Sequence, residues 1–149
     1  MNYQITHRYS PGTVIWSGEI ADCESEARQK GYAVIAAFEA RADLTGADLT
    51  GANLTDAYLA RANLARANLA RANLTDANLA RANLTGADLT GADLTGAYLA
   101  GVTLTRAFLA GVTLTRANLQ GADLAGAYLT GANLTDAEAC CPVALTRAV

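Results

Sequence analysis

The sequence repeats a five-residue word without interruption through most of its length. From Ala42 to Asp136 the chain divides into nineteen consecutive pentapeptides, and leucine stands at the centre of every one. Alanine precedes each leucine by two positions, except at Val102 and Val112, and the residue between them is Asn, Asp, Tyr, Thr or Phe. A strict internal period indicates a repeat architecture, in which each unit buries its apolar side against its neighbours.

A leucine at every fifth position fits neither a straight helix nor a straight strand. On an α-helix successive leucines would lie about 140° apart and form no stripe. On a strand their odd spacing would place them on alternate faces. Within one repeat, however, alanine and leucine are two positions apart, so an extended triplet points both to the same side. The two remaining residues must then turn the chain.

A turn every five residues predicts a polygonal coil, and a square of four pentapeptides is the natural solution. The coils then stack at the roughly 4.8 Å spacing of neighbouring strands. Alanines keep the walls close and leucines fill the axis, among them Leu64, Leu69, Leu74, Leu79 and Leu84.

The last residue of each word predicts the turn that follows the leucine. Ten of the nineteen repeats end in glycine, as at Gly46 and Gly126. Glycine suits the third position of a type II turn, where φ is positive. For repeats that end in Arg or Asp we expect type I-like or irregular turns, so the turn type should change along the rod.

The words ADLTG, ANLTD, ANLAR and AYLAG resemble those of the pentapeptide-repeat family, whose pattern is A(D/N)LXX. The resemblance covers residues 42–136. It implies an all-β solenoid, a right-handed quadrilateral β-helix, here of nearly five coils. Because the repeated residues are the structural ones, the resemblance says little about function.

Residues 1–41 differ from the repeats and are expected to form an N-terminal cap, because an open coil exposes backbone edges and core. Tyr3–Arg8 and Val14–Glu19 are predicted as two strands around a turn at Ser10-Pro11-Gly12. Asp22 is predicted to cap a helix that runs to about Ala40 and covers the first coil.

Residues 137–149 form a C-terminal cap or tail in this interpretation. Ala139 and Ala144 stand where leucine is due, and Pro142 opposes strand pairing. The apolar tail either folds over the last coil or leaves that end to a second subunit, as in the end-to-end dimers that the family resemblance implies. The sequence leaves both alternatives open.

Composition favours a non-catalytic protein without cofactor or metal. His7 is the single histidine, and Cys23, Cys140 and Cys141 show no metal-ligand spacing. We expect reduced thiols and a cytoplasmic location, since the N-terminus lacks an apolar signal region and no run of about 18 apolar residues exists. The net charge of -3 from 11 basic and 14 acidic residues makes direct nucleic-acid binding unexpected.

Residues twenty apart should stack in columns, so candidate binding residues are sought there. Arg41, Arg61 and Arg81 form one column, which is either a set of solvated corners or a basic ridge for an acidic partner. Asn63 and Asn83 are predicted to form a stacked amide ladder.

Exposed aromatic residues are the other candidates. Phe108 and Tyr128, one coil apart, should be in contact. Tyr58 and Tyr98 are predicted on an adjacent face, two coils apart. Aromatic side chains at such positions either bind a partner or stabilise the stack of coils.

The sequence therefore predicts a rigid scaffold that presents flat faces to a protein partner whose identity it does not indicate. The alternative is a DNA mimic that modulates a type II topoisomerase (gyrase), as in quinolone-resistance members of the family. A mimic needs rows of carboxylates, whereas residues 42–136 hold eight Asp, no Glu and six Arg. A surface with no single partner is a third interpretation.

Overall fold

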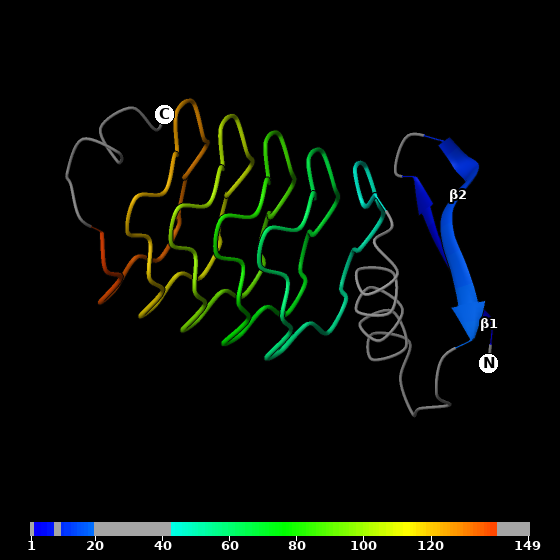
Figure 1. The fold of residues 1–149 in the computed structure, drawn as a ribbon. Helices are drawn as coiled ribbons and strands as arrows, with labels where there is room; N and C mark the ends of the chain where they lie inside the picture. The colour runs from blue at the N-terminus through cyan, green and yellow to red at the C-terminus, as the bar shows by residue number, and fades with distance from the viewer. Residues whose placement is uncertain (1, 8–9, 20–42, 140–149) are drawn as a thin grey trace.

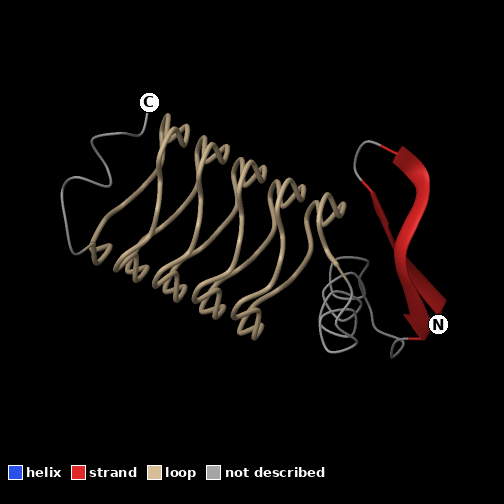
Figure 2. Cartoon of the chain, turned by 45° about the horizontal axis from the view of Figure 1, so that its top comes forward, coloured by secondary structure: helices blue, strands red, loops and turns tan. Residues whose placement is uncertain are grey.

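The chain winds into a stack of similar coils between Asp43 and Ala139, as the computed structural model shows (Figures 1 and 2). The structure describes residues 2–7, 10–19 and 43–139. Parallel bridges join fifteen outward residues of the coil, from Asp48 to Asn118, to the residue twenty positions further on, for example Asn63 to Asn83 and Asn83 to Thr103. Four pentapeptides therefore complete one coil, as the leucine spacing predicts.

Neighbouring coils are joined by three kinds of backbone hydrogen bond that recur along most of the rod. The Leu64 N–H donates to the Asn83 carbonyl at 2.8 Å, and the Asn83 N–H donates to the Ala62 carbonyl at 2.9 Å. At the corner, the Arg66 N–H donates to the Thr85 carbonyl at 2.9 Å. These bonds recur along the rod and satisfy the main-chain groups that a buried wall would otherwise leave unpaired.

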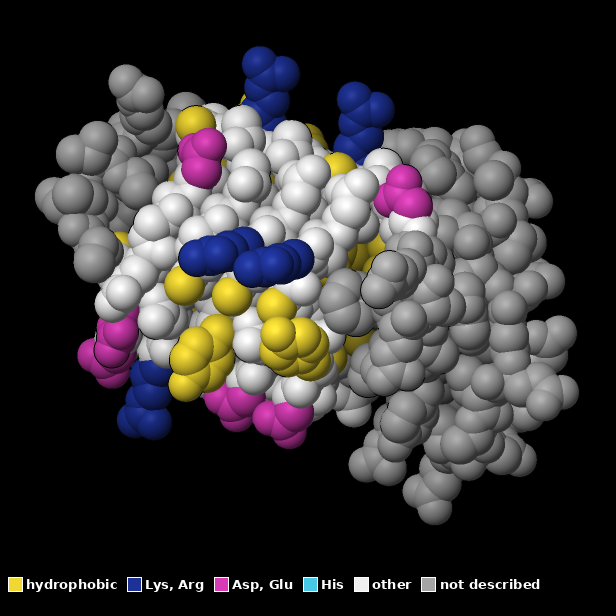
Figure 3. All heavy atoms as spheres, in the orientation of Figure 1, with side chains coloured by type: hydrophobic (Ala, Val, Ile, Leu, Met, Phe, Trp, Pro, Cys, Tyr) yellow, Lys and Arg dark blue, Asp and Glu magenta, His cyan; other side chains and the backbone are white. Residues whose placement is uncertain are grey.

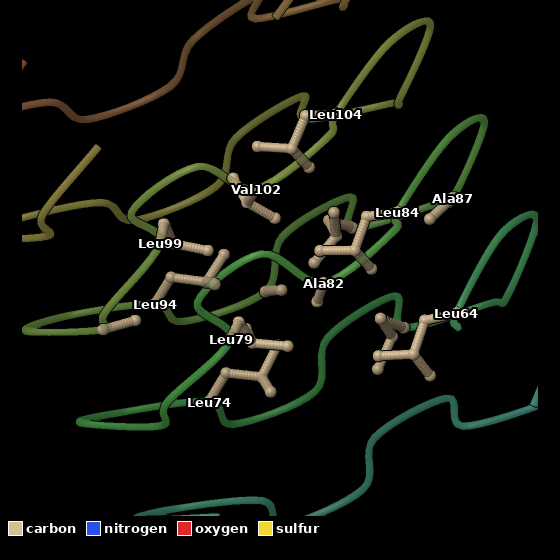
Figure 4. Packing of buried hydrophobic residues seen from close by; sticks show 14 of the residues in the cluster. Leu64, Leu74, Leu79, Ala82, Leu84, Ala87, Leu94, Leu99, Val102 and Leu104 are labelled. Carbon is tan, nitrogen blue, oxygen red and sulfur yellow. The ribbon is translucent and has the colours of Figure 1, made fainter. Parts of the chain in front are cut away.

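Alanine and leucine fill the interior of the coils, which confirms the inward prediction (Figure 4). The five predicted core leucines, Leu64, Leu69, Leu74, Leu79 and Leu84, are fully buried. Burying one leucine side chain contributes roughly 1.5–3 kcal/mol, so the column of leucines is the main source of stability. Leu129 and Leu134, in the last described coil, are only partly buried.

The corners all use one kind of turn, and the prediction of changing turn types is wrong. In each repeat the leucine carbonyl accepts a hydrogen bond from the N–H three residues on; for example, the Ala47 N–H donates to the Leu44 carbonyl at 3.0 Å. The third residue of the turn has a φ of 63–70° at the ten glycines and 56–64° at the nine Arg and Asp corners. A left-handed conformation is unfavourable for Arg, whereas Asp tolerates it better because its short polar side chain can form local hydrogen bonds. The conformation persists because both flanking triplets are held by the coils above and below.

A separate hairpin is formed by β1 (Asn2–His7) and β2 (Ser10–Glu19), which pair antiparallel. The two predicted strands are confirmed, with one correction. Since His7 pairs with Ser10, the Ser10-Pro11-Gly12 stretch lies in β2 and not in the turn. Proline is tolerated near the start of a strand.

Two predictions about the ends fall outside the described residues: the helix between Asp22 and Ala40, and the arrangement of residues 140–149. Pairing of the coils continues to Glu138, which bridges Asn118, two residues beyond the predicted end of the repeats. The division into a cap, a repeat region and a tail stays a prediction.

Candidate binding faces

The rod has four faces, which we number in chain order and define by their outward residues. The first face carries Asp43, Asn63, Asn83, Thr103 and Asp123. The second carries Asp48, Asn68, Asp88, Phe108 and Tyr128. The third carries Asn53, Asn73, Asp93, Thr113 and Asn133. The fourth carries Tyr58, Asn78, Tyr98, Asn118 and Glu138.

The outward Asn and Asp residues serve the coil itself. Asn83 Oδ1 accepts hydrogen bonds from the Thr85 backbone N–H at 3.1 Å and from the Thr85 hydroxyl at 2.7 Å. Its Nδ2 donates to Asn63 Oδ1 at 3.3 Å, which confirms the predicted amide ladder. The bond to the N–H two residues on recurs at most Asn and Asp positions, so these side chains brace the next corner. Sequence reasoning missed this role, although the preference for Asn or Asp before most of the leucines indicates it.

Asp43 shows the electrostatic consequence of the same local bond. Its Oδ1 accepts from the Thr45 hydroxyl at 2.6 Å and from the Thr45 N–H at 3.0 Å. These bonds, the hydroxyl bond first, hold the pKa of Asp43 below its ordinary value of 3.8. The carboxylate is therefore ionised at neutral pH and engaged in the turn.

The aromatic pair on the second face stacks as predicted. The rings of Phe108 and Tyr128 lie 5.2 Å apart between centroids and within 9° of parallel. Each side chain is nevertheless 47% exposed. The stack thus stabilises two adjacent coils and leaves its ring edges open to a partner.

Tyr58 and Tyr98 lie on the fourth face, in one column on either side of Asn78. They are 66% and 57% exposed. The prediction that they stand on a face adjacent to Phe108 and Tyr128 is wrong. Ten residues separate Tyr98 from Phe108, which is half a coil, so the two aromatic pairs lie on opposite faces. One flat partner cannot contact both.

Arginines stand at the corners beside the first face. Arg61 and Arg81 are exposed and stack along the corner between the fourth and first faces, as predicted, while Arg41 lies outside the described residues. A second row on the opposite edge of the first face, Arg66 and Arg106, was not anticipated. The signal was present in the sequence, because residues five apart occupy the two ends of one face.

The described residues contain no group of three or more His, Cys, Asp or Glu side chains that could hold a metal ion. In the same part of the chain, no helix has the length and apolar character that crossing a membrane requires. The side chains that stand out chemically are therefore the exposed aromatics and the corner arginines.

A four-sided coil of pentapeptides with an aliphatic interior and flat polar faces defines a solenoid repeat protein of the β class. The family model for pentapeptide repeats matches residues 40–76, 57–96 and 97–136. The chain belongs to the pentapeptide repeat family.

Solved structures of the same family resemble this chain. A pentapeptide repeat protein from the Arabidopsis thaliana thylakoid lumen is 38% identical, with a TM-score of 0.60, over 61% of this chain and 63% of its own. The match thus spans less than two thirds of the Arabidopsis protein. One from Nostoc PCC 7120 is 36% identical, with a TM-score of 0.55, over 62% of this chain and 84% of its own.

A more distant match is the plasmid-mediated fluoroquinolone resistance protein QnrB1, at 19% identity and a TM-score of 0.36 over 60% of this chain and 56% of its own. A likeness this low carries no argument about function. No curated protein matches the chain significantly.

Proposed function

We propose that the protein is a non-catalytic, rigid scaffold that binds a protein partner through its flat faces. The observation that carries this proposal is the placement of the four large hydrophobic residues that are exposed on the described rod, Tyr58, Tyr98, Phe108 and Tyr128. All four stand at the outward position, where most other repeats of the coil use Asn or Asp. Phenylalanine has no oxygen, and the tyrosine hydroxyl lies at the far end of its ring, too far from the main chain to accept from the N–H two residues on. The coil therefore gives up the bond that braces the next corner. Exposed aromatic residues are enriched among the residues that dominate binding energy.

The wall around these residues suits them to binding. Backbone hydrogen bonds fix these residues to the neighbouring coils. The Tyr98 N–H donates to the Ala77 carbonyl of the preceding coil at 2.9 Å, and the Tyr98 carbonyl accepts from the Leu79 N–H of that coil at 2.8 Å. The adjacent Leu99 N–H donates to the Asn118 carbonyl of the following coil at 2.8 Å. A preformed backbone loses little conformational entropy when a partner docks.

Affinity capture from an extract of the native host, quantified by mass spectrometry, tests the proposal. Two variants restore the family residue on one face each: Tyr58→Asn with Tyr98→Asn, and Phe108→Asn with Tyr128→Asn. The matched control is Thr103→Asn with Thr113→Asn, which makes the same replacement at non-aromatic outward positions. We expect one aromatic variant to lose a captured protein by about tenfold, the effect of roughly 1.4 kcal/mol. Equal capture by all four proteins would contradict the proposal.

The alternative of a DNA mimic acting on gyrase gains no support from the arrangement of acidic residues. Asp88 and Asp93 stand on adjacent faces, and the corner column of Asp56 and Asp76 continues with Gly96 and then with an arginine. Carboxylates therefore form no long row on the described rod. A gyrase supercoiling assay tests this alternative directly, and inhibition or protection at micromolar protein would revive it.

We further propose that both ends of the coil are covered, and that the coil is right-handed as the family resemblance implies. The partly buried Leu134 supports the need for a cover at the C-terminal end. The tail and a second subunit remain alternative covers there. Light scattering and thermal unfolding of the full chain against a chain that ends at Asp136 separate them, and two equally stable monomers would exclude both. Residues 1–41 as the other cap, and a cytoplasmic location, stay predictions.

A further inference from the structure

Two rows of arginine border the first face of the rod. Arg61 and Arg81 line one edge, Arg66 and Arg106 line the other, and all four are exposed. The strip between the rows carries the uncharged residues Asn63, Asn83 and Thr103. Figure 3 shows such a white strip of surface with dark-blue side chains along both borders. We call this surface the arginine-bordered face.

The stems of three of these arginines lie against glycines of the next coil. The Cγ atoms of Arg81 and Arg106 lie 3.5 Å from the points where a Cβ would stand on Gly101 and Gly126. The Cγ of Arg66 lies 3.8 Å from the corresponding point on Gly86. The first part of each stem therefore leans over the corner glycine of the following coil, in the space that glycine leaves open. Packing of this kind reduces the side-chain entropy that a charged contact must overcome.

Charge is distributed unevenly around the rod. The arginine-bordered face and its two corners hold four arginines and two aspartates in the described residues, and the aspartates, Asp43 and Asp123, stand at its two ends. The third face, directly opposite, holds with its corners two arginines and four aspartates: Arg71, Arg116, Asp56, Asp76, Asp93 and Asp136. An anionic ligand is attracted to one face and repelled by the opposite one.

The aspartates at the two ends of this face, Asp43 and Asp123, limit the length of an anionic ligand that it can bind. Four coil spacings separate Asp43 from Asp123, which is about 19 Å at strand spacing. An extended peptide of about six residues fits that length. A longer nucleic acid strand would carry its phosphates past both carboxylates, and this face offers no aromatic side chain on which bases could stack. The face therefore favours a short acidic stretch of polypeptide over a polynucleotide.

We propose that the arginine-bordered face binds an extended acidic segment of a protein partner, with carboxylates against both arginine rows. This inference rests on the proposed scaffold function. It adds the chemistry of one partner segment, which is acidic, and assigns that segment to a face without aromatic residues. Surface ion pairs are individually weak and screened by salt. Binding should therefore depend on several arginines together and weaken steeply as ionic strength rises.

Fluorescence anisotropy of a labelled hexaglutamate peptide, titrated with the full chain at low salt, tests the proposal. The variant Arg81→Gln with Arg106→Gln removes one arginine from each row. The control, Arg71→Gln with Arg116→Gln, makes the same change in net charge at corners of the same left-handed conformation on other edges. We expect about a tenfold loss of affinity in the first variant and less than about twofold in the control, as several weak surface ion pairs would give.

Circular dichroism of both variants establishes that they fold equally well. Equal weakening by the two variants, or no binding of hexaglutamate at low salt, would overturn the proposal. Tighter binding of a twenty-nucleotide oligothymidylate that depends on Arg81 and Arg106 would overturn it in favour of nucleic acid. The variants that replace Tyr58 and Tyr98 should still bind hexaglutamate, so failure here is separate from failure of the aromatic faces.

Discussion

Replacing Gly111 by alanine tests the uniform left-handed corner in isolation. Gly111 has a φ of 63°, and an added Cβ would meet no other atom within 4 Å. The substitution therefore adds backbone strain without a steric clash. A left-handed conformation is unfavourable for an L-residue by roughly 1–2 kcal/mol, and the stiffer unfolded chain returns about 0.4–1 kcal/mol of this. We expect Gly111→Ala to lower the free energy of unfolding by about 1 kcal/mol on these values.

Urea unfolding followed by circular dichroism measures the effect. The slope of the free energy of unfolding against urea concentration should not change, which would show that the folded state keeps its compactness. Gly111→Asn is the matched control, because asparagine visits the left-handed region more readily than alanine. The expected order of stability is glycine, then asparagine, then alanine. A Gly111→Ala protein as stable as the parent would refute the assigned corner conformation.

The same substitution at Gly96 adds a steric clash with a neighbouring side chain to the backbone strain. Gly96 has a φ of 68°, and a Cβ placed there would collide with Oδ1 of Asp76 in the coil below. Gly96→Ala should therefore be more destabilising than Gly111→Ala by the amount needed to move that carboxylate. In an Asp76→Ala background the two glycine substitutions should have equal effects, and a double-mutant cycle measures the coupling. Zero coupling would contradict the described contact.

Three further perturbations follow from the outward residues. Asn83→Ala removes the hydrogen bonds that brace its corner and should lower the free energy of unfolding by about 1–2 kcal/mol, whereas Asn83→Asp keeps the acceptor and should lower it less in the same urea assay. The pKa of Asp43 is lowered in the folded state. The contribution of Asp43 to stability is therefore present above pH 3.8 and is lost as the pH falls through the folded pKa. Thr45→Ala removes the hydroxyl that lowers this pKa, so it should reduce the pH dependence of the free energy of unfolding measured from about pH 5 to about pH 2. A double-mutant cycle on Phe108→Ala and Tyr128→Ala should give a coupling of about 0.5–1.5 kcal/mol, and a value near zero would mean that the rings do not stack in solution.

The period of the coil and the inward residues could be predicted from sequence because both follow from spacing. Only a turn every fifth residue brings Leu74 and Leu79 into one interior, and the structure confirms that inference. The turn type could not be read in the same way. Arg is a poor left-handed residue in isolation, yet the hydrogen-bonded coils on both sides impose a φ of 58° on Arg71, close to the 56° of Asp76. Tertiary structure overrides local preference at these corners.

The candidate binding surfaces were only partly predictable. Contact between Phe108 and Tyr128 follows from their spacing of one coil, and the rings are stacked. The relation between faces requires counting around the square, which places Tyr98 opposite Phe108 and not beside it. The position of the Arg81 stem over Gly101 of the next coil depends on side-chain geometry, which the amino-acid sequence alone does not give.

The most direct test of the account compares a charge placed inside the coil with the same charge placed one residue away on its surface. Leu79 is fully buried, whereas the neighbouring Asn78 faces outward. Leu79→Asp buries a carboxylate with no partner, a penalty of several kcal/mol that a rod of this size cannot absorb. Asn78→Asp keeps the oxygen that accepts from the Ala80 N–H at 3.0 Å. Thermal unfolding monitored by circular dichroism should show no folded Leu79→Asp protein and a nearly unchanged Asn78→Asp protein. A stable Leu79→Asp rod, or an unfolded Asn78→Asp chain, would contradict the assignment of inward and outward positions on which every proposed binding face depends.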